Sequence, residues 1–286
     1  MRIYDRHKRE YIETEQYGQG KLQFLYGNPI GRILLRLVIS SFTSRLYGFY
    51  NSLPVSAKKI PPFIEKYQIS LDEYEKSEFR SFNEFFTRKR RPEAIHIDLH
   101  PNALISPADS KLLVYNVTDD LKLTVKGSPY TLEELVGKKI DVSDYSGGLC
   151  LVFRLCMDDY HRYCFIDSGK VADSFFIKGR LHTVSSISKD YKIFKENARA
   201  VTVCETEHFG RVIQIEVGAL LVGRIVNHER KTFRKGEEKG FFEPGGSTIV
   251  LLLKKNTADI DGELLEQSRQ GIETVVRYGE RIGQKL

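Results

Sequence analysis

The sequence predicts an α+β protein, with a helical N-terminal region followed by a mostly antiparallel β sandwich or barrel-like domain. Two observations lead to this fold class. Apolar residues recur at helical spacing in the first 95 residues, and beyond residue 103 short β-rich runs alternate with turn residues. The chain has 286 residues, 41% of them hydrophobic, which is enough for one sizeable core. We therefore expect a helical region over residues 1–95 and a β-rich domain over residues 96–286.

Residues 29–50 carry the main helical pattern of the first region. Ile33, Leu34, Leu37, Val38 and Phe42 recur near the 3.6-residue period, with arginines between them. This helix either packs on its own protein or lies on a membrane surface with its arginines among lipid phosphates. The apolar run is shorter than the roughly 20 residues that span a bilayer. Further helices are expected over 56–69, with Ser56 as a candidate N-cap, and after Ser81.

The second region is expected to be a sheet domain. Continuous or alternating apolar runs predict strands over 112–117, 121–125, 148–155, 200–206, 211–226 and 247–254. Turn clusters such as Ser146-Gly147-Gly148 separate them, as in a sandwich or barrel. A short helix over 131–136 interrupts the pattern, and the last 25 residues are helical or mixed in texture.

Charge and cysteine usage limit the classes of partner. The net charge of +6 suits phosphate-bearing partners, either nucleic acid or anionic lipid. No zinc-finger, basic-zipper or RNA-binding motif is present, so we do not expect nucleic acid as a partner. The four cysteines, Cys150, Cys156, Cys164 and Cys204, form no Cys-x-x-Cys pair, and the histidines lack metal-ligand spacing. We therefore expect no metal, and a reducing compartment.

Four stretches carry residues suited to chemistry: SPADSK (106–111), CMDDYHRYCFIDSG (156–169), EVGALLVGRI (216–225) and FFEPGGSTIVLLL (241–253). Each also has an ordinary interpretation as a turn, a local hydrogen bond or a bulge. Together, Asp109, His161 and Ser247 contain the parts of an acid, base and nucleophile set. Ser247 follows two glycines and opens a strand, unlike the strand-to-helix elbow of many hydrolases. This placement favours attack by the Ser247 hydroxyl on its own preceding carbonyl, at a strained Gly-Gly turn.

In this order, the stretches resemble motifs of the phosphatidylserine decarboxylases, which are pyruvoyl-dependent enzymes made as self-cleaving proenzymes. The resemblance also includes SFNEFFTRKRRPEAIHID (81–98) and KGSPYTLEELVG (126–137), and KGEEKGFFEPGGSTIVLLL (235–253) is similar to the family's processing region. It implies cleavage between Gly246 and Ser247, which gives a β chain of residues 1–246 and an α chain of residues 247–286. Ser247 would become the pyruvoyl group, whose ketone takes the substrate amine and accepts the electrons released as CO₂ leaves. The product would be phosphatidylethanolamine.

The resemblance also implies roles and partners. Asp109 would orient or activate the processing machinery, and His161 would position the substrate or deliver a proton. A phospholipid substrate, an anionic membrane surface, the two cleaved chains of this protein and a second copy in a homodimer are the expected partners. The expected location is peripheral, on the cytoplasmic face of the cell membrane. The lipid substrate favours the membrane-surface interpretation of the helix over 29–50.

The sequence departs from the family pattern at several positions. Cys164 occupies the position of a second histidine, the one usually assigned to the Asp-His-Ser set for self-cleavage. Self-cleavage would then be slow, or would rely on His161 or on a Cys164 thiolate. Further departures are Ser110, Leu220, Leu221, Arg224 and the stretch LHTVSS (181–186). Two alternatives therefore stay open: an uncleaved, inactive relative that binds phospholipid, and a pyruvoyl decarboxylase for another headgroup or amino acid.

Overall fold

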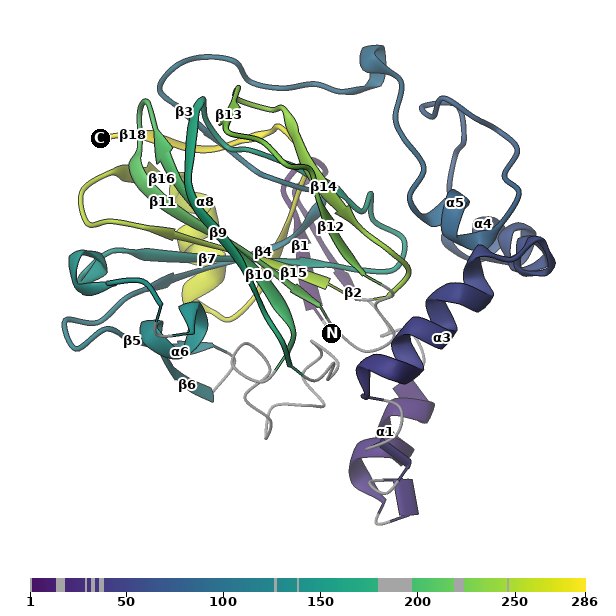
Figure 1. Cartoon of the computed structure of the whole chain (residues 1–286). Coiled ribbons are helices and arrows are strands. Elements are labelled where there is room, and N and C mark those ends of the chain that lie inside the picture. Colours follow the sequence, from purple (N-terminus) through teal and green to yellow (C-terminus); the bar gives the residue numbers. More distant parts are fainter. Residues whose placement is uncertain are drawn as a thin grey trace.

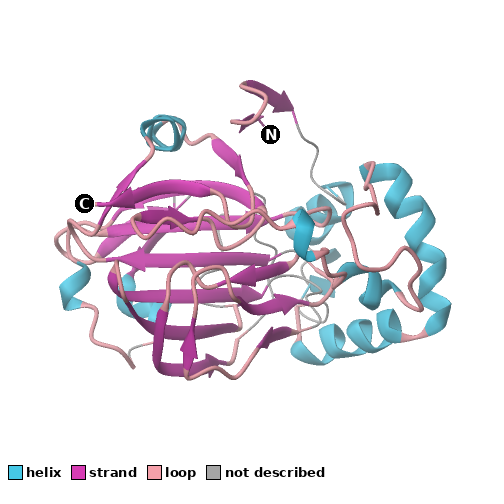
Figure 2. Cartoon of the chain, turned by 90° about the horizontal axis from the view of Figure 1, so that it is seen from above, coloured by secondary structure: helices cyan, strands magenta, loops and turns pink. Residues whose placement is uncertain are grey.

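The structure is a computed structural model of the whole chain (Figure 1). It describes residues 2–13, 19–28, 30–31, 34–35, 39–125, 128–137, 139–179, 197–218, 224–245 and 247–286. A β-rich body occupies one side of the molecule, and helices α1, α3, α4 and α5 lie on the other (Figures 1 and 2). The predicted α+β class, with a largely antiparallel sheet, is confirmed.

A ten-stranded sheet forms the centre of the body, in the order β13-β9-β10-β11-β15-β7-β4-β17-β1-β2. The strands are β13 (Thr232–Phe233), β9 (Gly169–Ile177), β10 (Arg199–Thr206), β11 (Gly210–Gly218), β15 (Ser247–Leu253), β7 (Leu149–Leu155), β4 (Ser110–Asn116), β17 (Glu273–Val276), β1 (Arg2–Asp5) and β2 (Glu10–Glu13). All neighbouring strands are antiparallel except β1 and β17. Strand β15 lies between β11 and β7 and is buried along its whole length. The predicted buried strand after Gly246 is therefore confirmed.

Side chains on the two faces of β15 enter two different cores. Ile249 and Leu251 belong to a cluster that also receives side chains from two three-stranded sheets, whereas Val250 and Leu252 pack with helix α6 (Leu132–Val136). The small sheets are β12 (Ile225–Asn227) with β14 (Glu238–Phe242) and β8 (Arg162–Cys164), and β16 (Ala258–Ile260) with β18 (Arg281–Lys285) and β3 (Ala103–Ile105). This arrangement is a sandwich. A two-stranded ribbon, β5 (Lys122–Val125) and β6 (Ser128–Thr131), and helix α8 (Gly262–Arg269) complete the body.

The helical side contains α1 (Gln19–Gly27), α3 (Ser41–Ser52), the 3₁₀ turns η1 (Pro54–Lys59) and η2 (Pro92–Ala94), α4 (Ile60–Tyr67) and α5 (Phe82–Phe86). The continuous helix expected over 29–50 is wrong, because Ser40 is extended and its hydroxyl caps the start of α3. Ser56 is not an N-cap either. Its hydroxyl hydrogen is shared between the carbonyls of Asn51 and Leu53, and its oxygen accepts from the Phe82 amide. The predicted cap at Ser81 is confirmed by its bond from the Glu84 amide.

Two further differences concern the strands. The chain begins with the β1–β2 hairpin, which extends the large sheet, so its first residues are not helical. The run predicted as strand over 211–226 is divided between β11 and β12, which belong to different sheets; residues 219–223 lie outside the described part. A division of the chain near residue 95 stays a prediction. Within the described residues, no helix is long and apolar enough to cross a membrane.

Candidate active site

The site is built around the first residue of β15. Ser247 pairs with Gly218 of β11 and Leu155 of β7, and its side chain is fully buried. Its Oγ lies 3.4 Å from Nδ1 of His161, in the loop that joins β7 to β8. Gly245 has a φ of 145°, in a region that favours glycine, while Gly246 lies outside the described residues. Two of the predicted site residues are thus brought together.

The protonation state of His161 follows from its other contact. Nε2 lies 2.8 Å from the carbonyl oxygen of Cys156, and because a carbonyl only accepts, Nε2 carries the proton. The lone pair of Nδ1 therefore faces the Ser247 hydroxyl. Burial lowers the pKa of His161 to about 3, and the ring of Phe86 lies 4.1 Å from the imidazole, centre to centre. At neutral pH this histidine is uncharged, which is the form that a base requires.

Asp109 is held by other groups. Arg90 donates two bonds to its carboxylate, at 2.6 and 3.3 Å, and the backbone amide of Tyr278 donates a third at 2.8 Å. Among the hydrogen bonds of the described residues, Asp109 has none to Ser247 or His161. The predicted three-residue set is therefore not one connected chain of hydrogen bonds.

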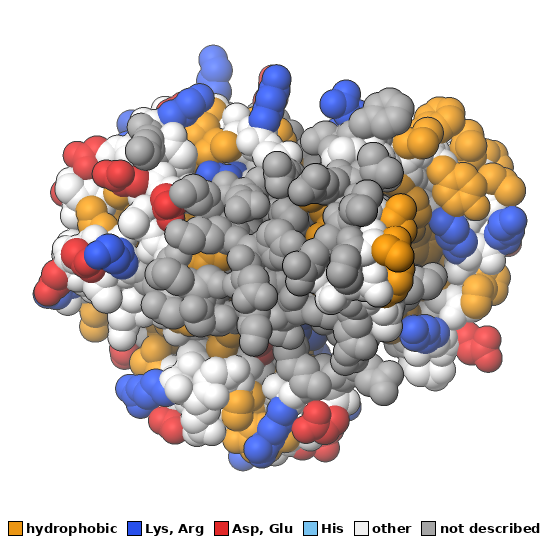
Figure 3. Space-filling model, turned by 90° about the horizontal axis from the view of Figure 1, so that it is seen from below, with side chains coloured by type: hydrophobic (Ala, Val, Ile, Leu, Met, Phe, Trp, Pro, Cys, Tyr) orange, Lys and Arg blue, Asp and Glu red, His pale blue; other side chains and the backbone are white. Residues whose placement is uncertain are grey.

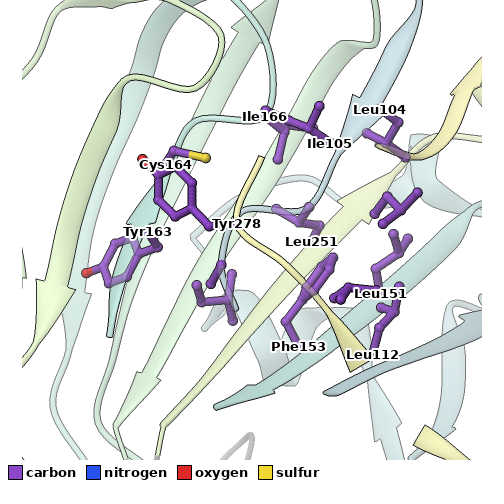
Figure 4. Packing of buried hydrophobic residues seen from close by; sticks show 14 of the residues in the cluster. Leu104, Ile105, Leu112, Leu151, Phe153, Tyr163, Cys164, Ile166, Leu251 and Tyr278 are labelled. Atoms are coloured by element: carbon purple, nitrogen blue, oxygen red, sulfur yellow. The ribbon is translucent and has the colours of Figure 1, made fainter. Parts of the chain in front are cut away.

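Cys164 ends strand β8 inside the packed core. Its thiol lies 3.9 Å from the carbonyl of Ser106 and next to Tyr278 (Figure 4). Burial raises the pKa of Cys164 to about 12, so the residue is a neutral thiol at physiological pH. A thiolate base at this position is therefore disfavoured. Ser110, another departure, is buried and donates to the carbonyl of Ala108.

The stretch 216–225 contributes a buried ion pair beside the site. Glu216 lies on the same face of β11 as Gly218, the partner of Ser247, and accepts from Nζ of Lys239 at 2.8 Å. Asn227 donates to the same carboxylate oxygen at 3.0 Å. Leu220 and Leu221 lie outside the described residues, as does 181–186, and Arg224 is exposed near Glu243.

Sequence reasoning missed two parts of the site. The carbonyl of Cys156 fixes the histidine proton, but a backbone acceptor leaves no side-chain signal. Phe86 covers His161 from the helical side of the molecule, and its only signal is its place in the phenylalanine-rich run after Ser81.

The fold and the site define an α+β protein with a buried serine–histidine pair at the start of a central strand. Residues 82–284 match the family model described as phosphatidylserine decarboxylase. The chain is 50% identical over 284 residues to phosphatidylserine decarboxylase proenzyme 2 of Clostridium acetobutylicum, covering 99% of this chain and 98% of the relative. It is 39% identical to the proenzyme of Clostridium botulinum strain Alaska E43 (100% and 99% covered) and 40% identical to that of Desulfitobacterium hafniense strain Y51 (99% and 98%). The chain belongs to the phosphatidylserine decarboxylase family.

Proposed function

We propose that this protein decarboxylates phosphatidylserine to phosphatidylethanolamine, using a pyruvoyl group made from its own Ser247. The observation that carries the proposal is the Ser247 hydroxyl at 3.4 Å from the unprotonated nitrogen of a neutral histidine. Its full-length relatives are named as proenzymes, which supports a processing step.

Self-cleavage would begin at the Gly246–Ser247 bond. Oγ of Ser247 attacks the carbonyl carbon of Gly246 while its proton passes to Nδ1 of His161. The C–N bond then breaks, the nitrogen takes up a proton, and an ester joins the two chains. The α-proton of residue 247 is then lost to solvent, a double bond forms between Cα and Cβ as the Cβ–O bond breaks, and Gly246 leaves as a carboxylate. Water then hydrolyses the remaining dehydroalanine, which releases ammonia and leaves the pyruvoyl group at residue 247.

The residues around Ser247 fit such a group. The backbone of β15 is held on both sides by β11 and β7, so a new chain end at residue 247 would stay in place. The pyruvoyl ketone would supply an electron sink for the bonding electrons that stay on the substrate α-carbon when CO₂ leaves. Phe86 packs on the buried His161 side chain, and this burial keeps the imidazole neutral beside residue 247.

We also propose that the helical side rests on an anionic membrane surface. Leu46 and Phe49 of α3 are 58% and 64% exposed and lie three residues apart, on one face of the helix. Val55 of η1 is exposed as well, and Arg45 and Lys58 belong to the same segments. Figure 3 shows hydrophobic side chains gathered at one side of the molecule with basic side chains among them. Such a surface suits a lipid headgroup layer.

The intact mass of the purified protein under denaturing conditions tests the proposal first. We expect a fragment of residues 247–286 that carries a pyruvoyl group in place of the N-terminal serine, and release of CO₂ from phosphatidylserine vesicles. Ser247→Ala should give a single uncleaved chain, whereas Ser146→Ala, a turn serine, should cleave normally. A single wild-type species of 32.9 kDa would favour the uncleaved lipid-binding alternative. A cleaved chain that is inert on phosphatidylserine would favour another headgroup.

A further inference from the structure

The loop that carries His161 is closed by a reciprocal pair of hydrogen bonds. The backbone amide of Asp159 donates to the carbonyl of Cys156 at 3.1 Å, and the amide of Cys156 donates to the Asp159 carboxylate at 2.6 Å. The same Cys156 carbonyl accepts a hydrogen bond from Nε2–H of His161. The conformation of the turn over 156–159 therefore decides where this acceptor lies relative to the imidazole.

Lys111 fixes the carboxylate that closes this turn. Its Nζ lies 2.6 and 2.8 Å from the two oxygens of Asp159, and both side chains are largely buried. Lys111 belongs to β4, so the turn is anchored to the large sheet from a neighbouring strand. Although burial alone would lower it, the pKa of Lys111 is raised by Asp159 and by the acidic groups next to it. The lysine is charged throughout the physiological range.

A second ion pair supports the first. Arg154 of β7 faces Lys111 across the β4–β7 register and donates to the Glu273 carboxylate from β17 at 3.0 Å. Nη1 of Arg154 also lies 2.9 Å from the sulfur of Cys156. Both ends of the turn are thus tied to charged side chains of the sheet, on the face opposite to Ile249 and Leu251.

We propose that Lys111 and Asp159 are positioning residues that set the His161 tautomer, and through it the readiness of Ser247 for self-cleavage. The proposal rests on the function proposed above. With the turn closed, the Cys156 carbonyl accepts a hydrogen bond from Nε2–H of His161, and the lone pair of Nδ1 faces Ser247. With the turn released, the carbonyl no longer selects this tautomer, and the proton is free to occupy Nδ1. A histidine with the proton on Nδ1 cannot accept the Ser247 proton at that atom.

The same contacts predict a pH dependence. Burial raises the pKa of Asp159 to about 6, against the attraction of Lys111, and the neighbouring Asp158 raises it further. The Arg154 guanidinium, which is bonded to Glu273, and the Cys156 thiol also lie close to Asp159. Protonation of Asp159 weakens the acceptor for both Lys111 and the Cys156 amide. Self-cleavage should therefore slow as the pH falls through about 6, although His161 itself stays neutral there.

Tautomer and cleavage can be measured separately. In the uncleavable Ser247→Ala protein labelled with ¹⁵N-histidine, with His161→Gln used for assignment, long-range ¹H–¹⁵N spectra should show His161 with the proton on Nε2. Lys111→Met and Asp159→Asn should give a mixture of tautomers. In the Ser247 background the same two substitutions should slow cleavage at least tenfold, out of the 10²–10⁴ that a general base typically provides. Asp159→Asn should also remove the fall in rate near pH 6.

Two further variants separate positioning from folding. The double variant Lys111→Met/Asp159→Asn removes both buried charges, so its thermal stability should exceed that of Lys111→Met alone. Slow cleavage and a mixture of His161 tautomers should persist in it.

Recovery of the wild-type cleavage rate in the double variant, or a pure Nε2 tautomer in Asp159→Asn, would overturn the proposal. Lys122→Met, which removes an exposed pair with Asp120, is the matched control and should change neither readout. If wild type itself fails to cleave, the proposed function fails, while the tautomer measurement still decides the positioning role.

Discussion

At the scale of single residues, His161 combines the correct protonation state with low basicity. A pKa of about 3 makes the imidazole a weak proton acceptor. The ring is nevertheless already neutral at physiological pH, and the lone pair of its Nδ1 is held beside the Ser247 hydroxyl. Orientation thus compensates for part of the missing basicity. A self-cleavage that happens once in the life of each chain tolerates a slow base.

The buried neutral state of His161 should appear in the acid stability of the protein. Because the folded-state pKa lies below the ordinary 6.5, its stabilisation is present above pH 6.5 and is lost as the pH falls toward 3. At about 1.4 kcal/mol for each pKa unit, roughly 2 kcal/mol should be lost between pH 7 and pH 5. Urea unfolding of Ser247→Ala at both pH values should show this loss, and addition of His161→Gln should reduce it. An equal loss with and without His161 would contradict the buried neutral imidazole.

Cys164 and His161 should differ sharply when each is removed. His161→Gln should slow self-cleavage by about 10²–10⁴, because it removes the acceptor for the Ser247 proton. Cys164→Ala should keep the rate within about tenfold of wild type, since its thiol is neutral and contacts the Ser106 carbonyl. Mass spectrometry of cleavage over time measures both.

Cys164→His adds volume to a packed position and should not accelerate cleavage. Acceleration would show that the family's second histidine is the missing base.

At the scale of elements, the sequence predicted the helices and strands whose hydrophobic residues are periodic or continuous. Strand β15 was found because continuous hydrophobicity is a strong local signal. Helix α6 falls within the predicted 131–136, and in the structure Thr131 caps it. Strand β9 was missed because its side chains are mostly exposed or half-exposed, so no burial pattern marks it. The helix predicted over 29–50 was too long because hydrophobic periodicity does not reveal that Ser40 is extended and caps the start of α3.

The candidate site likewise contains residues that the sequence could predict and a protonation state that it could not. Ser247 could be chosen from sequence because it follows two glycines and opens a strand, and His161 because it lies in a stretch that resembles a family motif. The tautomer could not, because it depends on the Cys156 carbonyl, and that carbonyl is placed by Asp159 and Lys111 from another strand. Tertiary contacts between charged groups distant in sequence have no local pattern.

Helix α3 gives a prediction for membrane binding. Leu46→Ser/Phe49→Ser removes two exposed apolar side chains, each of which would contribute roughly 1.5–3 kcal/mol when fully buried in lipid. Co-flotation with vesicles that contain anionic phospholipid should fall at least tenfold. Phe176→Ser, on exposed β9, is the matched control and should bind as wild type. Equal binding by all three proteins would place the membrane contact elsewhere.

At the scale of the whole molecule, the predicted α chain is interleaved with the rest of the fold. Strand β15 lies between β11 and β7, β17 lies between β4 and β1, and β18 pairs with β3. All four cysteines are free thiols. Hydrogen-bonded ladders and shared cores therefore hold residues 247–286 in place, and the two chains should co-elute after cleavage with or without a reducing agent.

The N-terminal hairpin makes the contact that tests this association most directly. Arg6, in the turn after β1, lies 2.9 Å from Asp261, 2.8 Å from Glu263 and 3.3 Å from Glu280, three carboxylates of the predicted α chain. Arg6→Met should lower the free energy of α-chain release by about 1–3 kcal/mol, because one cation serves a network of three acids. Urea-dependent dissociation of the cleaved protein, followed by size exclusion, measures the change. Lys8→Met removes a more exposed pair with Glu10, within the β chain, and should leave the midpoint unchanged. Equal midpoints for wild type and Arg6→Met would show that the strand ladders alone hold the two chains together.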